Sequence, residues 1–138
     1  MYDVLKAVHL IAVVTAISGM VAVALGLGLR TGQAPAIEVR LRPLHVWDRA
    51  VTGPALAIAL IAGFTLAADA GFLSSGWLLL KLCLVAALSG LHLLQGSALA
   101  RLCERDGGPV PLMSGRPWLV LTIAAPIILL AVIKPSVS

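Results

Sequence analysis

The chain alternates between long apolar runs and short segments that carry most of its charge. Four apolar runs predict membrane-spanning helices at about 4–29, 50–69, 76–100 and 117–133. A span needs roughly 20 apolar residues, a length that the first three runs reach and the last approaches. The sequence therefore predicts an all-α fold, an integral membrane four-helix bundle in which residues 1–138 form a single transmembrane domain.

The connections between these runs carry turn-forming residues. The first, over residues 31–49, contains Pro35 and Pro43, so we expect a loop there. Its residues 37–47 mix apolar and basic side chains, which favours a position along the membrane interface. Residues 69–75 are predicted to form a short turn, so the helices before and after it should be antiparallel neighbours. Residues 101–116 are predicted to form a loop rich in glycine and proline.

The basic residues predict the orientation of the bundle. Seven of the ten Lys and Arg residues flank the first and third connections, and three lie on the opposite side. Because cytoplasmic loops carry an excess of Lys and Arg, both termini are expected on the non-cytoplasmic side. For a bacterial source, this describes a multi-pass protein of the inner membrane. The seven are Arg30, Arg40, Arg42, Arg49, Arg101, Arg105 and Arg116, and the three are Lys6, Lys81 and Lys134.

Composition narrows the class of protein further. Hydrophobic residues make up 60% of the chain and charged residues 12%, against about 25% charged in soluble domains. A soluble globule and a disordered chain are therefore both excluded as the default. The net charge of +4 comes from basic residues between apolar runs, which face the lipid bilayer rather than nucleic acid. Two cysteines without a CxxC motif argue against zinc and covalently attached haem.

Polar residues inside the predicted spans are the functional candidates, because burying them in lipid is costly. His9 and Met20 are eleven residues apart on the first helix, and Lys81 and His92 are eleven apart on the third. Eleven residues make about three turns and return to nearly the same face. Since these two helices run in the same direction, we expect two levels: His9 with Lys81 near the outer surface, and Met20 with His92 near the inner one.

Each level suits a different chemistry. His9 and Lys81 suit an anion, a porphyrin carboxylate or proton transfer. His92 and Met20 suit haem iron, whose axial ligands are commonly imidazole and thioether, or Cu(I). Because His9 and His92 differ in depth by about 15 Å, only one of them can ligate a given haem within one chain. Simpler roles remain open: Lys81 snorkels to the headgroups, and Met20 fills a gap in the packing.

Several of these residues occur together in a known family. The segment Lys6-Ala7-x-His9 followed by Gly19, and the segment Gly76-Trp77-Leu78-x-x-Lys81 followed by His92, resemble the first and third spans of the HemJ-type protoporphyrinogen oxidases. Pro54, Gly63, Pro126 and the closing Ile133-Lys134-Pro135 resemble its other spans, and the CopD copper-resistance membrane domain shares a looser version of the plan.

The resemblance implies a function. It implies a four-helix membrane protein that binds haem b, oxidises protoporphyrinogen IX to protoporphyrin IX and passes electrons to the respiratory chain. By the same resemblance, His9 would be a haem ligand or catalytic residue, and Lys81 a catalytic polar partner.

Three departures from the family pattern keep other functions open. Ala16 stands where the family has Trp, residues 21–26 replace an aromatic-Pro-Arg run, and residues 123–125 replace Asn-Glu. The chain could instead be a non-catalytic accessory subunit of a larger membrane complex, or a copper-handling protein. Association as an oligomer or with other membrane subunits is expected. Haem absorbance of the purified protein distinguishes the oxidase hypothesis from these alternatives.

Overall fold

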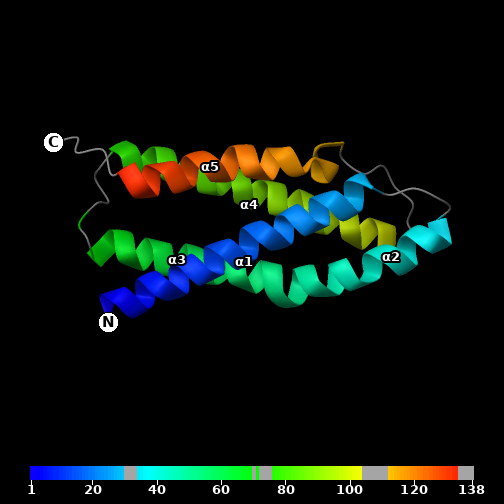
Figure 1. The fold of residues 1–138 in the computed structure, drawn as a ribbon, viewed down its shortest axis with the longest axis horizontal. Helices are drawn as coiled ribbons and strands as arrows, with labels where there is room; N and C mark the ends of the chain where they lie inside the picture. Colours follow the sequence, from blue (N-terminus) through cyan, green and yellow to red (C-terminus); the bar gives the residue numbers. More distant parts are fainter. Residues whose placement is uncertain (30–33, 70, 72–75, 104–111, 134–138) are drawn as a thin grey trace.

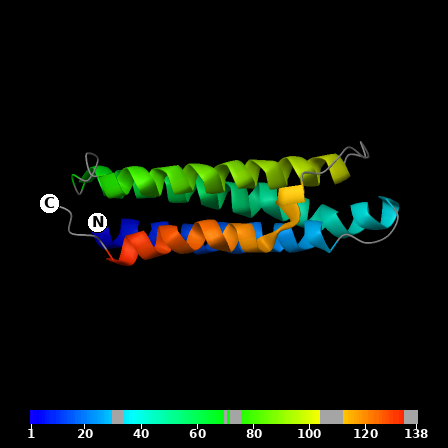
Figure 2. The same ribbon diagram turned by 90° about the horizontal axis from the view of Figure 1, so that it is seen from above.

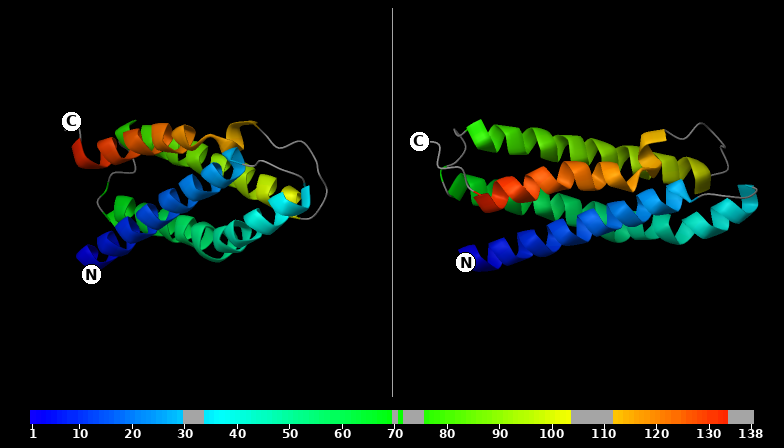
Figure 3. Two further views of the ribbon diagram at one scale, coloured as in Figure 1. Left: turned by 45° about the vertical axis from the view of Figure 1, so that its right-hand side comes forward. Right: turned by 45° about the horizontal axis from the view of Figure 1, so that its top comes forward.

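The protein is a bundle of helices. The structure, a computed structural model, describes residues 1–29, 34–69, 71, 76–103 and 112–133. Within these residues every regular element is helical, as the sequence predicts. Successive long helical segments run in opposite directions (Figure 1). The segments lie side by side when the bundle is seen from above and in oblique views (Figures 2 and 3).

Three helices follow the predicted apolar runs closely. α1 covers Tyr2–Gly28, α4 covers Gly76–Cys103 and α5 covers Pro117–Ile133. α5 begins with a proline, which fits the first turn of a helix because its missing N–H has no partner there. A short 3₁₀ helix, η3 (Leu112–Gly115), precedes α5.

The segment between α1 and the predicted second span differs from the expectation of a loop. α2 (Ala34–Trp47), a π-helical segment η1 (Asp48–Thr52) and α3 (Gly53–Asp69) follow one another without a break. The run predicted at 50–69 is therefore the second half of a longer helical rod. The prolines permit this, because Pro35 lies in the first turn of α2 and Pro43 removes only one backbone hydrogen bond.

Three helical stretches are long and apolar enough to cross a membrane. They are Tyr2–Gly28, Val39–Asp69 and Leu78–Cys103, with 27, 31 and 26 residues. The apolar stretch Pro117–Leu130 of α5 is shorter. By length and composition, the chain is therefore that of a membrane protein.

The surface of the bundle carries many large apolar side chains. Side chains such as Ile11, Ile61 and Leu93 are two-thirds or more exposed. Hydroxyl groups on this surface donate to carbonyls of their own helix, as Thr65 does to Ile61 and Thr122 to Trp118. Internal pairing of polar groups is what a hydrocarbon environment requires, because lipid offers no hydrogen-bond partners.

The interior contains two large apolar clusters. One joins Met20 and Ala24 of α1 to Leu88 and Leu91 of α4 and Val120 of α5. The other lies beyond it and consists of Val23, Leu27, Leu41, Ala98 and Leu99. α1 packs mainly against α3, and α4 packs against α2 and α5.

α1 ends and α2 begins at the same end of the bundle (Figure 1). Gly28 and Gly115 bring α1 and η3 together there, because a Cβ on Gly28 would lie 2.6 Å from the Gly115 carbonyl oxygen. Five exposed arginines belong to the segments near this end: Arg40, Arg42, Arg49, Arg101 and Arg116. Arg30, Arg105, Lys134 and the predicted loop over 104–111 lie outside the described residues.

Candidate functional site

The outer polar level is built on His9. Its Nδ1 donates a hydrogen bond to the Ala59 carbonyl of α3 at 2.9 Å, and its ring packs on Gly63 one turn further along. A Cβ on Gly63 would lie only 2.8 Å from the ring carbon Cε1. The hydrogen bond places the proton on Nδ1, so Nε2 retains a free lone pair. A backbone carbonyl on one ring nitrogen is the usual way in which a metal-ligating histidine is oriented.

Lys81 of α4 is the other residue predicted for this level. Both side chains are partly exposed, and a positive charge on Lys81 disfavours a positive charge on His9. That Lys81 and His9 share one binding level stays a prediction from the sequence. His9 contributes an imidazole nitrogen and Lys81 an ammonium group, and both residues are partly exposed.

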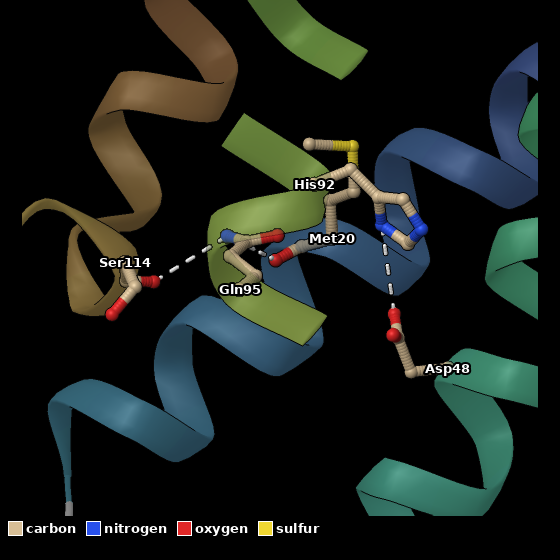
Figure 4. Close-up of polar contacts among 5 residues, drawn as sticks. All are labelled: Met20, Asp48, His92, Gln95 and Ser114. Carbon is tan, nitrogen blue, oxygen red and sulfur yellow. Dashed lines mark hydrogen bonds and ion pairs between the residues drawn. The ribbon is translucent and has the colours of Figure 1, made fainter. Parts of the chain in front are cut away.

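Met20 lies deep in the bundle rather than at an open site. Its side chain is 0% exposed and belongs to the apolar cluster with Leu88 and Leu91. Its backbone carbonyl accepts a hydrogen bond from Nε2 of Gln95 at 3.2 Å (Figure 4). The same Nε2 donates to the Ser114 carbonyl at 3.4 Å, so Gln95 connects α4 to α1 and to η3. In this position the Met20 thioether contributes to core packing.

His92 pairs with a carboxylate that the sequence analysis did not select. Its Nδ1 lies 3.7 Å from Oδ1 of Asp48, the first residue of the π-helical segment (Figure 4). The side chains are 12% and 5% exposed respectively. The other ring nitrogen, Nε2, faces Gly53, where an added Cβ would lie 3.8 Å away. Both ring nitrogens therefore face the α2–η1–α3 rod.

Glycines from three helical segments surround this pair. A Cβ on Gly96 of α4 would lie 3.5 Å from Oδ2 of Asp48. A Cβ on Gly53 would lie 3.4 Å from the Asp48 carbonyl oxygen, and one on Gly19 of α1 would overlap the Thr52 side chain. The close approach of these backbones is what encloses Asp48 and Thr52, which are 4% and 0% exposed.

Several polar atoms of this inner level have no hydrogen-bond partner among the described residues. They are His45 Nδ1, Asp48 Oδ1, Thr52 Oγ1, His92 Nδ1 and Gln95 Oε1. We call His45, Asp48, Thr52 and His92 the inner cluster. Burying a polar atom unpaired costs about 1–3 kcal/mol, so a concentration of such atoms is unusual for a purely structural region.

Asp48 and Thr52 are the residues that sequence reasoning missed, and His45 was covered only by the segment 37–47 expected along the membrane interface. Asp48 lies beside Arg49 in a segment rich in prolines and arginines, which is typical of a surface loop. The available signal was spacing: His45, Asp48 and Thr52 recur at intervals of three and four, which places them on one face if the segment is helical.

The two levels are separated along one helix. His9 contacts Ala59 and Gly63, whereas His92 contacts Asp48 and Gly53, about ten residues earlier, or about 15 Å along the axis. Among the described residues, no group of three or more His, Cys, Asp or Glu side chains is arranged to hold a metal ion. Comparison of the chain with protein-family models, curated proteins and solved structures gave no match.

Proposed function

We propose that the chain is a HemJ-like, haem b-associated protein of a bacterial inner membrane, with four spans and both termini outside the cytoplasm. Three stretches of spanning length and the apolar α5 support the span count. The exposed arginines near one end of the bundle support the orientation, since that end would face the cytoplasm and its anionic lipids.

His9 is the proposed haem ligand. The observation that carries this assignment is the hydrogen bond from its Nδ1 to the Ala59 carbonyl, which leaves Nε2 free and fixes the ring. Haem iron takes four ligands from its porphyrin, so a single histidine suffices as protein ligand. A haem b held there would supply one-electron oxidation and reduction.

Lys81 is the proposed partner for a porphyrin carboxylate. The positive charge on its ammonium group acts on His9. Opposite charges attract strongly where water is scarce, so Lys81 would draw the carboxylate of a bound tetrapyrrole toward His9. On this basis, and on the sequence resemblance, we propose protoporphyrinogen IX as substrate, with its electrons passing to the respiratory chain.

Visible spectra of the purified chain, oxidised and reduced, test the proposal. Wild-type protein is expected to show a b-type haem spectrum. His9→Ala is expected to lose most of the haem, whereas His92→Ala, whose ring faces the rod, is expected to retain it. His45→Ala serves as the matched control, because it removes a histidine from the inner cluster only. Full retention of haem in His9→Ala would overturn the assignment of the ligand.

Haem-free wild-type protein would overturn the haem proposal itself. That result would favour the alternative functions, a non-catalytic accessory subunit or a copper-handling protein. Porphyrinogen oxidation is assayed separately, with Lys81→Met expected to slow it at least tenfold while the protein keeps its haem. Lys6→Met, at the start of α1, is the control for loss of a lysine charge.

A further inference from the structure

The inner cluster offers a chemistry that haem binding at His9 does not use. Asp48 and His92 are a carboxylate and an imidazole, both enclosed by the bundle. Their separation of 3.7 Å is too long for a direct hydrogen bond and short enough for strong electrostatic attraction. A single water molecule or a small movement of either side chain connects the two groups.

The neighbours of this pair determine what it can bind. From its own rod, Asp48 faces His45, and from α4 it faces His92 and the uncharged Gly96. Thr52, on the same rod, packs on Gly19 of α1. The nearby Arg49 is exposed on the outside of the rod. No described lysine or arginine therefore neutralises Asp48, and a proton is the cation best suited to it.

The unpartnered atoms indicate water in the same region. Oδ1 of Asp48, Oγ1 of Thr52 and Nδ1 of His92 lack hydrogen-bond partners among the described residues. Buried polar groups of this kind are normally satisfied by internal water molecules that each make two to four hydrogen bonds. A π-helical turn is a frequent feature of functional sites, and here it carries both Asp48 and Thr52.

We propose that Asp48, His92 and Thr52 form a hydrated proton-binding site, in which Asp48 and His92 share one proton that exchanges with water. The proton enters from water onto the carboxylate–imidazole pair and returns to water when it leaves, so no other reactant is needed. Thr52 orients the water, because its hydroxyl can both donate and accept. The site is independent of haem, and it exists whether or not the proposed function is correct.

Infrared difference spectra of the full chain in lipid nanodiscs, recorded between low and high pH, test this proposal. Besides the carbonyl bands of the exposed carboxyl groups that are protonated at low pH, we expect one separate band from Asp48, and we expect this band to shift when H₂O is replaced by D₂O. Asp48→Asn is expected to abolish the band. Asp69→Asn is the matched control, because it removes an exposed carboxylate from the other end of the same rod and should leave the band intact.

Further samples keep the test decisive if Asp48→Asn does not fold. Wild-type protein carrying a heavy isotope in its aspartate carboxyl groups should show the same band shifted, and His92→Gln should move its position. A band that persists unchanged in Asp48→Asn overturns the assignment to Asp48. A band that does not respond to D₂O overturns the hydration of the site, and a band unaffected by His92→Gln overturns the shared proton.

Discussion

At the scale of single residues, the position of the His9 ring depends on the absence of a side chain at Gly63. Gly63 leaves room for the His9 ring, since a Cβ there would lie 2.8 Å from Cε1. An ordinary carbon–carbon contact is about 3.5–4.0 Å, so any larger residue must displace the imidazole. The hydrogen bond from His9 to the Ala59 carbonyl would be lost with it.

Gly63→Ala is therefore expected to destabilise the protein by about 1–3 kcal/mol, the usual cost of overpacking. Gly90→Ala is the matched control, because Gly90 lies in the middle of a helix with nothing within 4 Å of its added Cβ. That change should be neutral or stabilising by up to about 1 kcal/mol, since alanine favours helix over glycine. Reversible unfolding in mixed detergent micelles measures both, and equal effects would disprove the contact with His9.

At this scale, the sequence marks a polar residue as a candidate where it contrasts with apolar neighbours. His9, Lys81 and His92 stand out because each interrupts an apolar run. Asp48 does not stand out, because its neighbours include Arg49 and other charged residues. Its importance depends on burial, which arises only when the rod packs against α4.

At the level of elements, the contact between α1 and the π-helical segment is the tightest around the inner cluster. A Cβ on Gly19 would overlap the branched end of the Thr52 side chain, which is itself 0% exposed. The two segments can approach this closely only while position 19 has no side chain. Small residues have this role at many helix contacts in membranes.

Gly19→Ala is expected to destabilise the protein by about 1–3 kcal/mol, because the Thr52 side chain has no free space into which to move. Adding Thr52→Ala should recover part of the loss, since it removes the two atoms that meet the new methyl group most closely. Unfolding measurements on both single variants and the double variant give the coupling energy. A coupling near zero would mean that the two residues are not in contact.

The helical elements themselves were mostly predictable, and the exception has a physical reason. Long apolar runs leave no alternative to helix in a bilayer, which is why α1, α4 and α5 lie where the sequence predicts them. The rod begins earlier than predicted because α2 includes both prolines of the expected loop. Pro35 in a first turn and Pro43 inside α2 are both compatible with helix.

At the level of the whole molecule, the charge distribution predicts how the bundle sits in the membrane. The exposed arginines lie on α2, η1, the last turns of α4 and the residue before α5. Lys6 and Lys81 lie at the start of α1 and α4, toward the opposite end. The net charge of +4 does not reveal this uneven distribution of basic residues between the two ends.

Labelling of single cysteines in intact cells tests the orientation. With Cys83 and Cys103 replaced by alanine, Tyr2→Cys is expected to react with a membrane-impermeant maleimide from outside. Val39→Cys, exposed at the arginine-rich end, is expected to react only after the membrane is breached. The reverse pattern would show that the bundle is inserted the other way round.

The π-helical segment explains how one rod contacts two helices, α1 and α4, that lie in different directions from it. Eleven residues separate Asp48 from Ala59, and in an uninterrupted α-helix that spacing returns to within about 20° of the same direction. Yet Asp48 is directed toward α4, whereas Ala59 contacts His9 of α1. One extra residue turns a helix by about 100°, so the bulge sets the angular offset between the two faces. If the same residues formed uninterrupted α-helix, those faces would align, and the rod could then meet only one of its two histidines at a time.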